Sequence, residues 1–256
     1  INLLKGHIQL SEEAKKEAST ATFDLAHAQE KLWATLPAGF FDAIECCSEL
    51  HGIIEPTLAQ HADRDEVMKA SYEFLFGLIN KMFEKGYTSP QKIADNIDQF
   101  CFTIISPGLF DLHTSTRFMS HTILYCKTIK NLGTERHNDL LMEGVSFKTI
   151  GCYCLTELGH GSNAKGLETT ATYDNETQEF VVNSPTQTSM KFWIGNLGKS
   201  AHSAVVLAQL LIEEEGKLVS KGVHSFAFEI RDSMNHTPYP GIEIGDCGTK
   251  KGINGV

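Results

Sequence analysis

The chain has 256 residues, of which 41% are hydrophobic and 21% are charged, and its formal net charge at pH 7 is −10. This length and composition predict a folded protein with room for two domains, and they exclude a disordered chain. The acidic balance argues against a nucleic-acid partner, because phosphate contacts need a basic face. No apolar run reaches the ~18–20 residues that cross a bilayer, so we expect no membrane span.

Seven cysteines are scattered along the sequence, and none of them forms a Cys-x-x-Cys pair. An odd count without such a pair predicts reduced thiols rather than a disulfide framework. No His/Cys spacing typical of zinc sites occurs either, so we predict no metal site.

The first half of the sequence, residues 1–150, is predicted to be helical. The clearest pattern runs from Arg64 to Lys85, where apolar residues recur at helical spacing and Gly86 follows as a C-terminal cap. Proline, glycine and serine residues mark the ends of the other predicted helices. Further helices are expected over 11–18, 24–36, 89–102, 109–129 and 134–142.

Residues 151–256 are predicted to form a smaller β-domain. Thr169–Tyr173 and Glu179–Asn183 are β-rich runs joined by a turn, so they predict a hairpin. Two longer strands are expected over 204–212 and 224–230, and a fifth short one over 241–245. The fold class is therefore α+β, with an all-α helical domain followed by an antiparallel, barrel-like β-domain.

One stretch of the β half, Gly151–Asn163, combines a short apolar strand with a glycine-rich loop. The strand runs through Thr156 into a loop that contains Gly161 and Ser162. Such a loop presents bare backbone amides to a flat or anionic ligand, and the two hydroxyls add hydrogen-bonding groups. This pattern predicts a binding site for a polar heterocycle with a pyrophosphate.

A second stretch, Lys191–Asn196, places Trp193 close to Gly195. A large flat ring beside a position without a side chain suits a planar cofactor, which needs stacking on one side and clearance on another. Together the two stretches make the strongest functional signal in the chain.

Each of these residues also has an ordinary interpretation. A strand-end threonine often faces solvent, Trp193 would by default be a core or half-buried aromatic, and Gly195 would by default be a turn. His160 has no Ser/His/Asp set around it, so we interpret it as a solvated loop histidine. Glu157 and Glu168 are two acids among many and are not assigned as bases.

Two runs, TELGHGSNAKGLETTATYD and KFWIGNLGKSAHSAVVLAQL, resemble the middle domain of the acyl-CoA oxidases, flavin-dependent relatives of the acyl-CoA dehydrogenases. The similarity is close over 151–255 and looser over the helical part. It implies an N-terminal helical domain over 1–150 and a middle β-domain over 151–256. The family's C-terminal helical domain is absent from this sequence.

The resemblance implies FAD as the cofactor. It places Thr156 at the pyrimidine edge of the flavin, and Tyr153 and Leu155 along the ring. It places Trp193 at the aromatic position beside the flavin.

The resemblance also assigns three small residues. Gly161 and Ser162 belong to the cofactor loop, and Ser162 lies where the family's serine approaches both cofactor and acyl-CoA. Gly195 falls where dehydrogenases carry a hydroxyl residue and oxidases carry glycine. Without a side chain there, O₂ can approach the reduced flavin.

The implied reaction is α,β-desaturation of a fatty acyl-CoA, the first step of fatty acid β-oxidation. A base removes the α-proton, the β-hydride passes to flavin N5, and O₂ takes the electrons to give H₂O₂. The family's catalytic glutamate lies in the C-terminal domain beyond Val256, so no residue here is assigned as catalytic. The expected partners are fatty acyl-CoA and either a second copy in a homodimer or a chain that supplies the C-terminal helical half. The family implies a peroxisomal location, with the mitochondrion as the alternative.

A second hypothesis is a catalytically inactive, oxidase-derived structural subunit of a larger assembly. Thr156, Trp193 and Gly195 favour the enzyme, because a structural subunit has no need of a flavin shelf. The short chain, which ends at Val256 on an incomplete β-domain, favours the structural subunit. A flavin-binding module without acyl-CoA chemistry is a third alternative.

Overall fold

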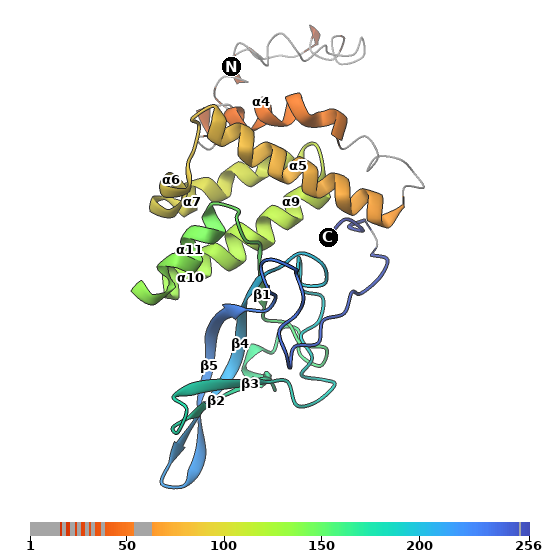
Figure 1. Ribbon diagram of the computed structural model, residues 1–256. Coiled ribbons are helices and arrows are strands. Elements are labelled where there is room, and N and C mark those ends of the chain that lie inside the picture. The colour runs from red at the N-terminus through yellow and green to blue at the C-terminus, as the bar shows by residue number, and fades with distance from the viewer. Residues whose placement is uncertain are drawn as a thin grey trace.

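The computed structural model describes residues 39–53, 63–250 and 252–256, together with isolated positions between 16 and 36. In Figure 1 the helices stack at one end of the molecule, and the strands that follow Gly151 extend from them as a long twisted sheet. Of the helix predicted over 11–18 only position 16 is described, and the helix predicted over 24–36 is described only at scattered positions, so neither prediction is tested. No helix in the described part of the chain is long and apolar enough to cross a bilayer.

Within the described residues, the helical half consists of α-helices linked by short 3₁₀ turns, with one π-helical segment. In chain order these elements are α4 (Phe40–Leu50), α5 (Arg64–Glu84), α6 (Pro90–Asp95), α7 (Ile97–Cys101), η2 (Phe102–Ile104), α8 (Ile105–Gly108), α9 (Leu112–Phe118), η3 (Met119–Cys126), α10 (Lys127–Leu132), η4 (Glu135–His137) and α11 (Asn138–Val145).

The helix predicted over 64–85 is confirmed as α5. Asp63 caps its first turn, because the carboxylate accepts hydrogen bonds from the amides of Asp65 and Glu66. Gly86 follows its C-terminal end with a φ of 71°, a left-handed conformation that glycine adopts without steric cost.

The helix predicted over 109–129 is a continuous helical rod that begins at Leu112 and ends at Leu132. Its middle, Met119–Cys126, is π-helical, which local propensities do not reveal. π-Helical segments inside α-helices are frequent at functional sites. This segment packs against β1 (Gly151–Cys154).

The helix predicted over 89–102 is divided at Asn96 into α6 and α7. Asn96 leaves helical geometry, with φ −137° and ψ 64°, and its side chain accepts a hydrogen bond from the amide of Gln99. An asparagine that caps a new helix competes with continuation of the old one.

The sheet has five strands, with the long β4 at its centre. After β1 these are β2 (Thr170–Asp174), β3 (Glu179–Asn183), β4 (Ser203–Glu214) and β5 (Lys217–Glu229). β5 pairs with β4 in the antiparallel direction along one edge. Along its other edge β4 pairs first with β1 and then with β2, both parallel, and β2 continues into the antiparallel β2–β3 hairpin.

The α+β class and the predicted hairpin are confirmed, and the two longer strands are found as β4 and β5, but the sheet is mixed and curled rather than antiparallel. β1 and β2 are each separated from β4 by a long connection, and parallel pairs need such crossovers. The hairpin signals of the sequence report only on neighbouring strands. The strand predicted over 241–245 is wrong, because this segment forms irregular chain.

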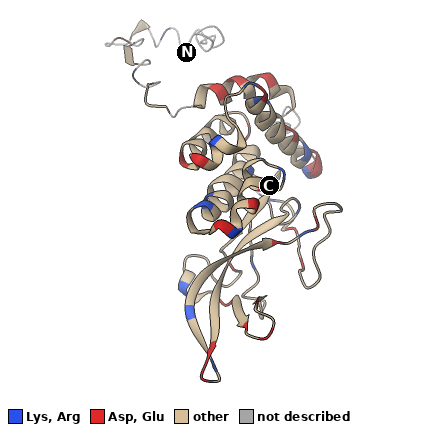
Figure 2. Ribbon diagram, turned by 60° about the vertical axis from the view of Figure 1, so that its left-hand side comes forward, with Lys and Arg blue, Asp and Glu red and all other residues tan. Residues whose placement is uncertain are grey.

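A two-residue turn joins β4 to β5 at the far end of the sheet. Glu215 and Gly216 have φ values of 52° and 77°, the left-handed pair that a type I′ hairpin turn requires. The acidic residues before it are exposed and form the red tip of the hairpin in Figure 2. The run Glu213–Glu215, predicted to be a solvated turn, is exposed as expected, but Glu213 and Glu214 end β4 and only Glu215 lies in the turn.

The main hydrophobic core extends from the helices onto the sheet. It includes Phe74 and Phe118 of the helices together with Val205 of β4, and Tyr153 packs against it. The alternate residues of β4 face a second, smaller cluster. Tyr153 and the turns that follow it are therefore held against the helical half.

Candidate functional site

A cavity of ≈ 380 Å³ lies between the rod formed by α9 and η3 and the loops that follow β1 and β3. Its volume is within the ~300–1,000 Å³ typical of small-molecule sites. Five residues predicted from the sequence line it: Tyr153, Leu155, Thr156, Trp193 and Gly195.

The two sequence stretches meet because their backbones pair. The amide of Phe192 donates to the carbonyl of Thr156 at 3.0 Å, and the amide of Leu158 donates to the carbonyl of Met190 at 2.9 Å. Between these bonds Glu157 and Lys191 form an antiparallel bridge. This short ladder places Thr156 and Trp193 on the same cavity.

Trp193 has an unusual backbone and an open ring. Its side chain is 56% exposed although it lines the cavity. Its φ is 59°, and Asn196 in the same loop has a φ of 68°. Such values cost a bulky residue on the order of 1–3 kcal/mol and gather at ligand sites. Trp193 is therefore not a core aromatic, and its ring is only partly covered.

Thr156 is partly buried at the end of β1. Its carbonyl is used by Phe192, but its hydroxyl makes no hydrogen bond within the residues that the structure describes. This hydroxyl can therefore donate to, or accept from, a bound molecule.

Gly195 faces η3 at close range. A Cβ on this residue would lie 2.5 Å from Oγ of Ser120. Packing against the helix by itself therefore explains the glycine. Access of O₂ to a cofactor at this position stays a prediction.

Gly161 and Ser162 do not join the other predicted residues. Both are exposed on the loop after β1, and neither lines the cavity. A Cβ on Gly161 would meet no atom within 4 Å, so packing does not require glycine there. Their assignment as cofactor and substrate contacts stays a prediction.

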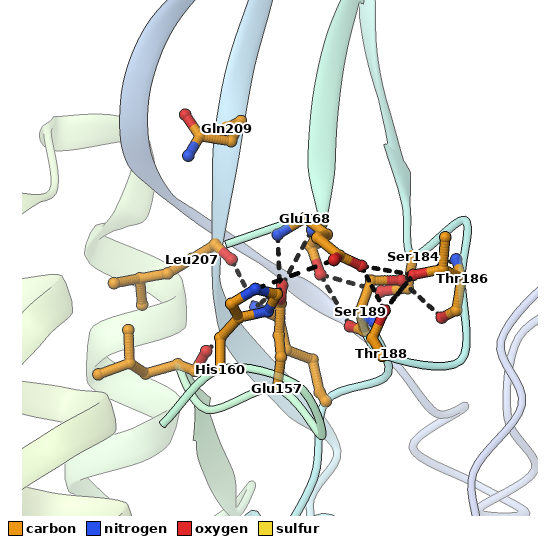
Figure 3. Close-up of polar contacts among 12 residues, drawn as sticks. Glu157, His160, Glu168, Ser184, Thr186, Thr188, Ser189, Leu207 and Gln209 are labelled. Carbon is orange, nitrogen blue, oxygen red and sulfur yellow. Dashed lines mark hydrogen bonds and ion pairs between the residues drawn. The ribbon is translucent and has the colours of Figure 1, made fainter. Parts of the chain in front are cut away.

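Glu157 and His160 differ from their interpretation as ordinary loop residues. The side chain of Glu157 is fully buried, and that of His160 is 20% exposed. Nδ1 of His160 lies 3.2 Å from a carboxylate oxygen of Glu157 (Figure 3). A buried carboxylate with several partners is a structural centre, which its sequence context does not signal.

Several lining residues were missed from the sequence. Arg117 is 1% exposed, its Nε donates to Oγ of Ser71 at 2.9 Å, and its guanidinium lies 3.6 Å from the ring centroid of Tyr72. Ser120 and Arg117 carry no local signal, because the direction they face depends on the helical rod. Lys191 had one available signal, since it directly precedes the Phe192–Trp193 pair.

Asn196 presents an unsatisfied polar atom in the same lining. Its Nδ2 donates to the carbonyl of Arg117 at 3.2 Å, while its buried Oδ1 has no partner in the described structure. A buried acceptor without a partner is costly and indicates a site for a missing donor.

The cavity is locally basic in an acidic protein. Its lining contains four cationic side chains, Arg117, Lys191, Lys199 and Lys250, and one carboxylate, Asp246. Asp246 is itself paired with Arg64 at 2.6 Å. Lys191 is likewise paired with the buried Glu157 at 3.1 Å, so the remaining positive charge comes from the other three cations. The balance of charge favours a ligand with negative groups.

Comparison with known proteins identifies the family. No protein-family model matches the chain. Human peroxisomal acyl-coenzyme A oxidase 3 is 33% identical over 202 residues, which are 79% of this chain and 28% of that protein. Peroxisomal acyl-coenzyme A oxidase 2 of Arabidopsis thaliana is 36% identical over 196 residues, which are 75% of this chain and 28% of that protein.

Solved structures agree with these sequences. Arabidopsis thaliana acyl-CoA oxidase 1 superposes with a TM-score of 0.75 and 30% identity, covering 94% of this chain and 35% of that one. Caenorhabditis elegans acyl-CoA oxidase-2, bound with FAD, ascaroside-CoA and ATP, superposes with a TM-score of 0.74 and 27% identity. This match covers 96% of this chain and 36% of that one. Sequence and fold together therefore place this chain in the acyl-CoA oxidase family, as a stretch that spans 28% of the length of those two curated relatives.

Proposed function

We propose that the protein carrying this chain is an FAD-dependent acyl-CoA oxidase, and that this chain supplies the shelf against which the flavin ring lies. One observation carries the proposal beyond family membership. Thr156 and Trp193, far apart in the sequence, line one cavity with a free hydroxyl and an open aromatic ring.

The residues of the cavity fit an isoalloxazine ring. Tyr153, Leu155 and Trp193 offer flat or apolar surface, and Thr156 offers a hydroxyl to the polar edge of the ring. The buried Oδ1 of Asn196 needs a donor, and the surrounding cations suit the phosphates of FAD or of CoA.

When bound, FAD would accept the hydride that leaves Cβ of the substrate while a base takes the α-proton, and it would pass the electron pair to O₂, giving H₂O₂. In this proposal Thr156 fixes the orientation of the ring through its hydroxyl. Trp193 covers the ring from water, and Gly195 leaves one approach free of a side chain. The contribution of this chain is orientation and electrostatics.

The α-proton needs a base that this cavity does not offer. Burial would raise the pKa of Asp246, but hydrogen bonds from Gly248 and Arg64 outweigh burial and lower it. A carboxylate with a lowered pKa is a weak base. We therefore propose that the base comes from a part of the protein outside this chain.

The names of the curated relatives support a location. They are named peroxisomal, so we propose a peroxisomal enzyme of fatty acid β-oxidation. The mitochondrial alternative has no support among these names. We further propose that a second copy, or a chain carrying the C-terminal helical half, completes the flavin site.

The decisive experiment is the visible spectrum of the intact protein. We expect flavin absorption that bleaches when a fatty acyl-CoA is added without oxygen, and that recovers in air with release of H₂O₂. A protein that stays colourless after incubation with excess FAD contradicts the proposal. That outcome would favour the catalytically inactive structural subunit.

A further inference from the structure

The sheet divides where β4 changes partner. β4 pairs with β1 up to Val206 and with β2 from Gln209 onward. Leu207 lies at this fork, and Nζ of Lys191 donates to its carbonyl at 2.8 Å. The same ammonium group donates to the carbonyl of Leu155 at 3.2 Å, and Leu155 is the first residue after β1.

The third donor of this ammonium group contacts Oε1 of Glu157 at 3.1 Å. All three N–H groups of Lys191 are thus directed at acceptors, which a buried cation requires. Burial lowers the pKa of Lys191, and the hydrogen bond to Glu157 opposes this effect.

Both carboxylate oxygens of Glu157 accept hydrogen bonds, just as all three N–H groups of Lys191 donate them. Its Oε1 also accepts from the amide of Thr169 at 2.9 Å, and its Oε2 accepts from the amide of Glu168 at 2.8 Å (Figure 3). Burial would raise its pKa, but these bonds and Lys191 outweigh burial and lower the pKa to about 2. Glu157 therefore stays charged and cannot act as a base at neutral pH.

We infer that the Glu157–Lys191 pair positions the flavin shelf by fixing Thr156 and Trp193 relative to the sheet. Thr156 lies between Leu155 and Glu157, which are both bound to Lys191, and Trp193 follows Lys191 by two positions. The two residues are positioning residues, because neither is proposed to take part in the chemistry. This inference rests on the proposed flavin site.

A purely stabilising role is the simpler explanation, and the energetics argue against it. Desolvation of two charges offsets most of their attraction, so a buried ion pair is a weak source of stability compared with packed apolar residues. The pair instead fixes the relative positions of three segments, because one ammonium group joins the end of β1, β4 and the loop before β2. A defined geometry at the edge of a cavity is what a ring-binding site needs.

The test uses Lys191→Met and Glu157→Gln in the intact protein. Hydrogen exchange without added FAD measures directly how often the ladder opens, because the amides of Leu158 and Phe192 form its hydrogen bonds. We expect exchange of both amides to become about tenfold faster or more in Lys191→Met, with α5 amides unchanged. FAD affinity should fall about 10–100-fold, as for other residues that orient a binding group. Glu157→Gln keeps an acceptor oxygen and should show a smaller loss.

A second readout isolates Trp193. Its fluorescence is obtained by subtracting the spectrum of Trp193→Phe, and we expect the Lys191→Met substitution to shift it in the protein without cofactor. The matched control is Lys81→Met, which removes an exposed ion pair with Glu49 of 2.7 Å far from the cavity. This control should change neither FAD affinity nor exchange of the ladder amides.

The outcomes separate this inference from the proposed function. If the unmodified protein binds FAD and Lys191→Met binds it equally well, the positioning role is overturned and the flavin site stands. If the unmodified protein binds no FAD, the proposed function fails, and ladder exchange still decides whether the pair sets this geometry. If Lys191→Met also loosens α5, the near-isosteric Glu157→Gln decides. Faster exchange confined to the ladder supports the inference, and unchanged exchange overturns it.

Discussion

The backbone amide of Gly151 donates a hydrogen bond of 2.9 Å to Nδ1 of His121. Nε2 of the same ring lies 3.0 Å from the carbonyl of Gly144, so the ring is neutral with its proton on Nε2. The side chain is fully buried between the rings of Tyr125 and Phe147. One imidazole thus joins η3 and α11 to the first residue of β1, the strand that leads into the cavity.

This buried histidine predicts a loss of stability in acid. Burial lowers the pKa of His121 to about 4, and the hydrogen bond to Gly144 only partly opposes this. The unfolded chain takes up a proton near pH 6.5, while the folded protein does so only near 4. The free energy of unfolding should therefore fall by up to about 3 kcal/mol as the pH drops from 6.5 to 4. Above pH 6.5 this contribution is constant.

Urea unfolding between pH 7 and pH 4 measures the effect. The His121→Gln variant should be less stable at pH 7 and should lose this part of the pH dependence. His51→Gln, at an exposed position, is the control and should keep it. An identical slope in His121→Gln and the unmodified protein would contradict the assignment.

Gly151→Ala should be strongly destabilising. A Cβ at this position would overlap the ring of Tyr125, which is fully buried. Overpacking of this kind costs about 1–3 kcal/mol or more. Chemical denaturation measures it, with Gly52→Ala as the control, because a Cβ on Gly52 meets no atom within 4 Å. Equal stability of the two variants would show that β1 shifts freely against η3.

Gly195→Ala separates the two explanations of this glycine. The new methyl group would lie 2.5 Å from Oγ of Ser120, so we expect a lower unfolding temperature. In Gly195→Ala/Ser120→Ala the nearest Ser120 atom is Cβ at 3.3 Å, and stability should largely return. If the glycine also admits O₂, reoxidation of the reduced protein in air should stay slow in the double variant. Full recovery of that rate would leave packing as the only role.

Thr156→Val should weaken FAD binding without affecting the fold. Valine keeps the shape of threonine but removes a hydroxyl that has no partner within the described residues. Loss of one hydrogen bond of about 1 kcal/mol corresponds to about fivefold weaker binding. Titration with FAD measures it, and Thr177→Val, exposed in the β2–β3 turn, is the control. Unchanged affinity would remove Thr156 from the proposed site.

The structure agrees with the predictions that depend on sequence patterns only a few residues long. The periodic apolar positions of α5 and the glycine cap at Gly86 predict that helix, and turn residues predict the β2–β3 hairpin. Five of the seven residues assigned to cofactor binding line one cavity, because the two motifs that contain them pair through a short ladder. Gly161 and Ser162, on the exposed loop, are not brought there.

The sequence by itself determined the α+β class, the β2–β3 hairpin and the resemblance to acyl-CoA oxidases, because propensity, turn chemistry and motif identity are local properties. Only the tertiary structure decided the parallel pairing of β1 and β2 with β4, the π-helical segment, and the burial of Glu157 against Lys191. The physical reason is that long crossovers and buried charges are set by contacts between segments distant in the chain. The sequence does not distinguish a buried glutamate from an exposed one, because burial depends on which distant segments fold around the side chain and exclude water from it.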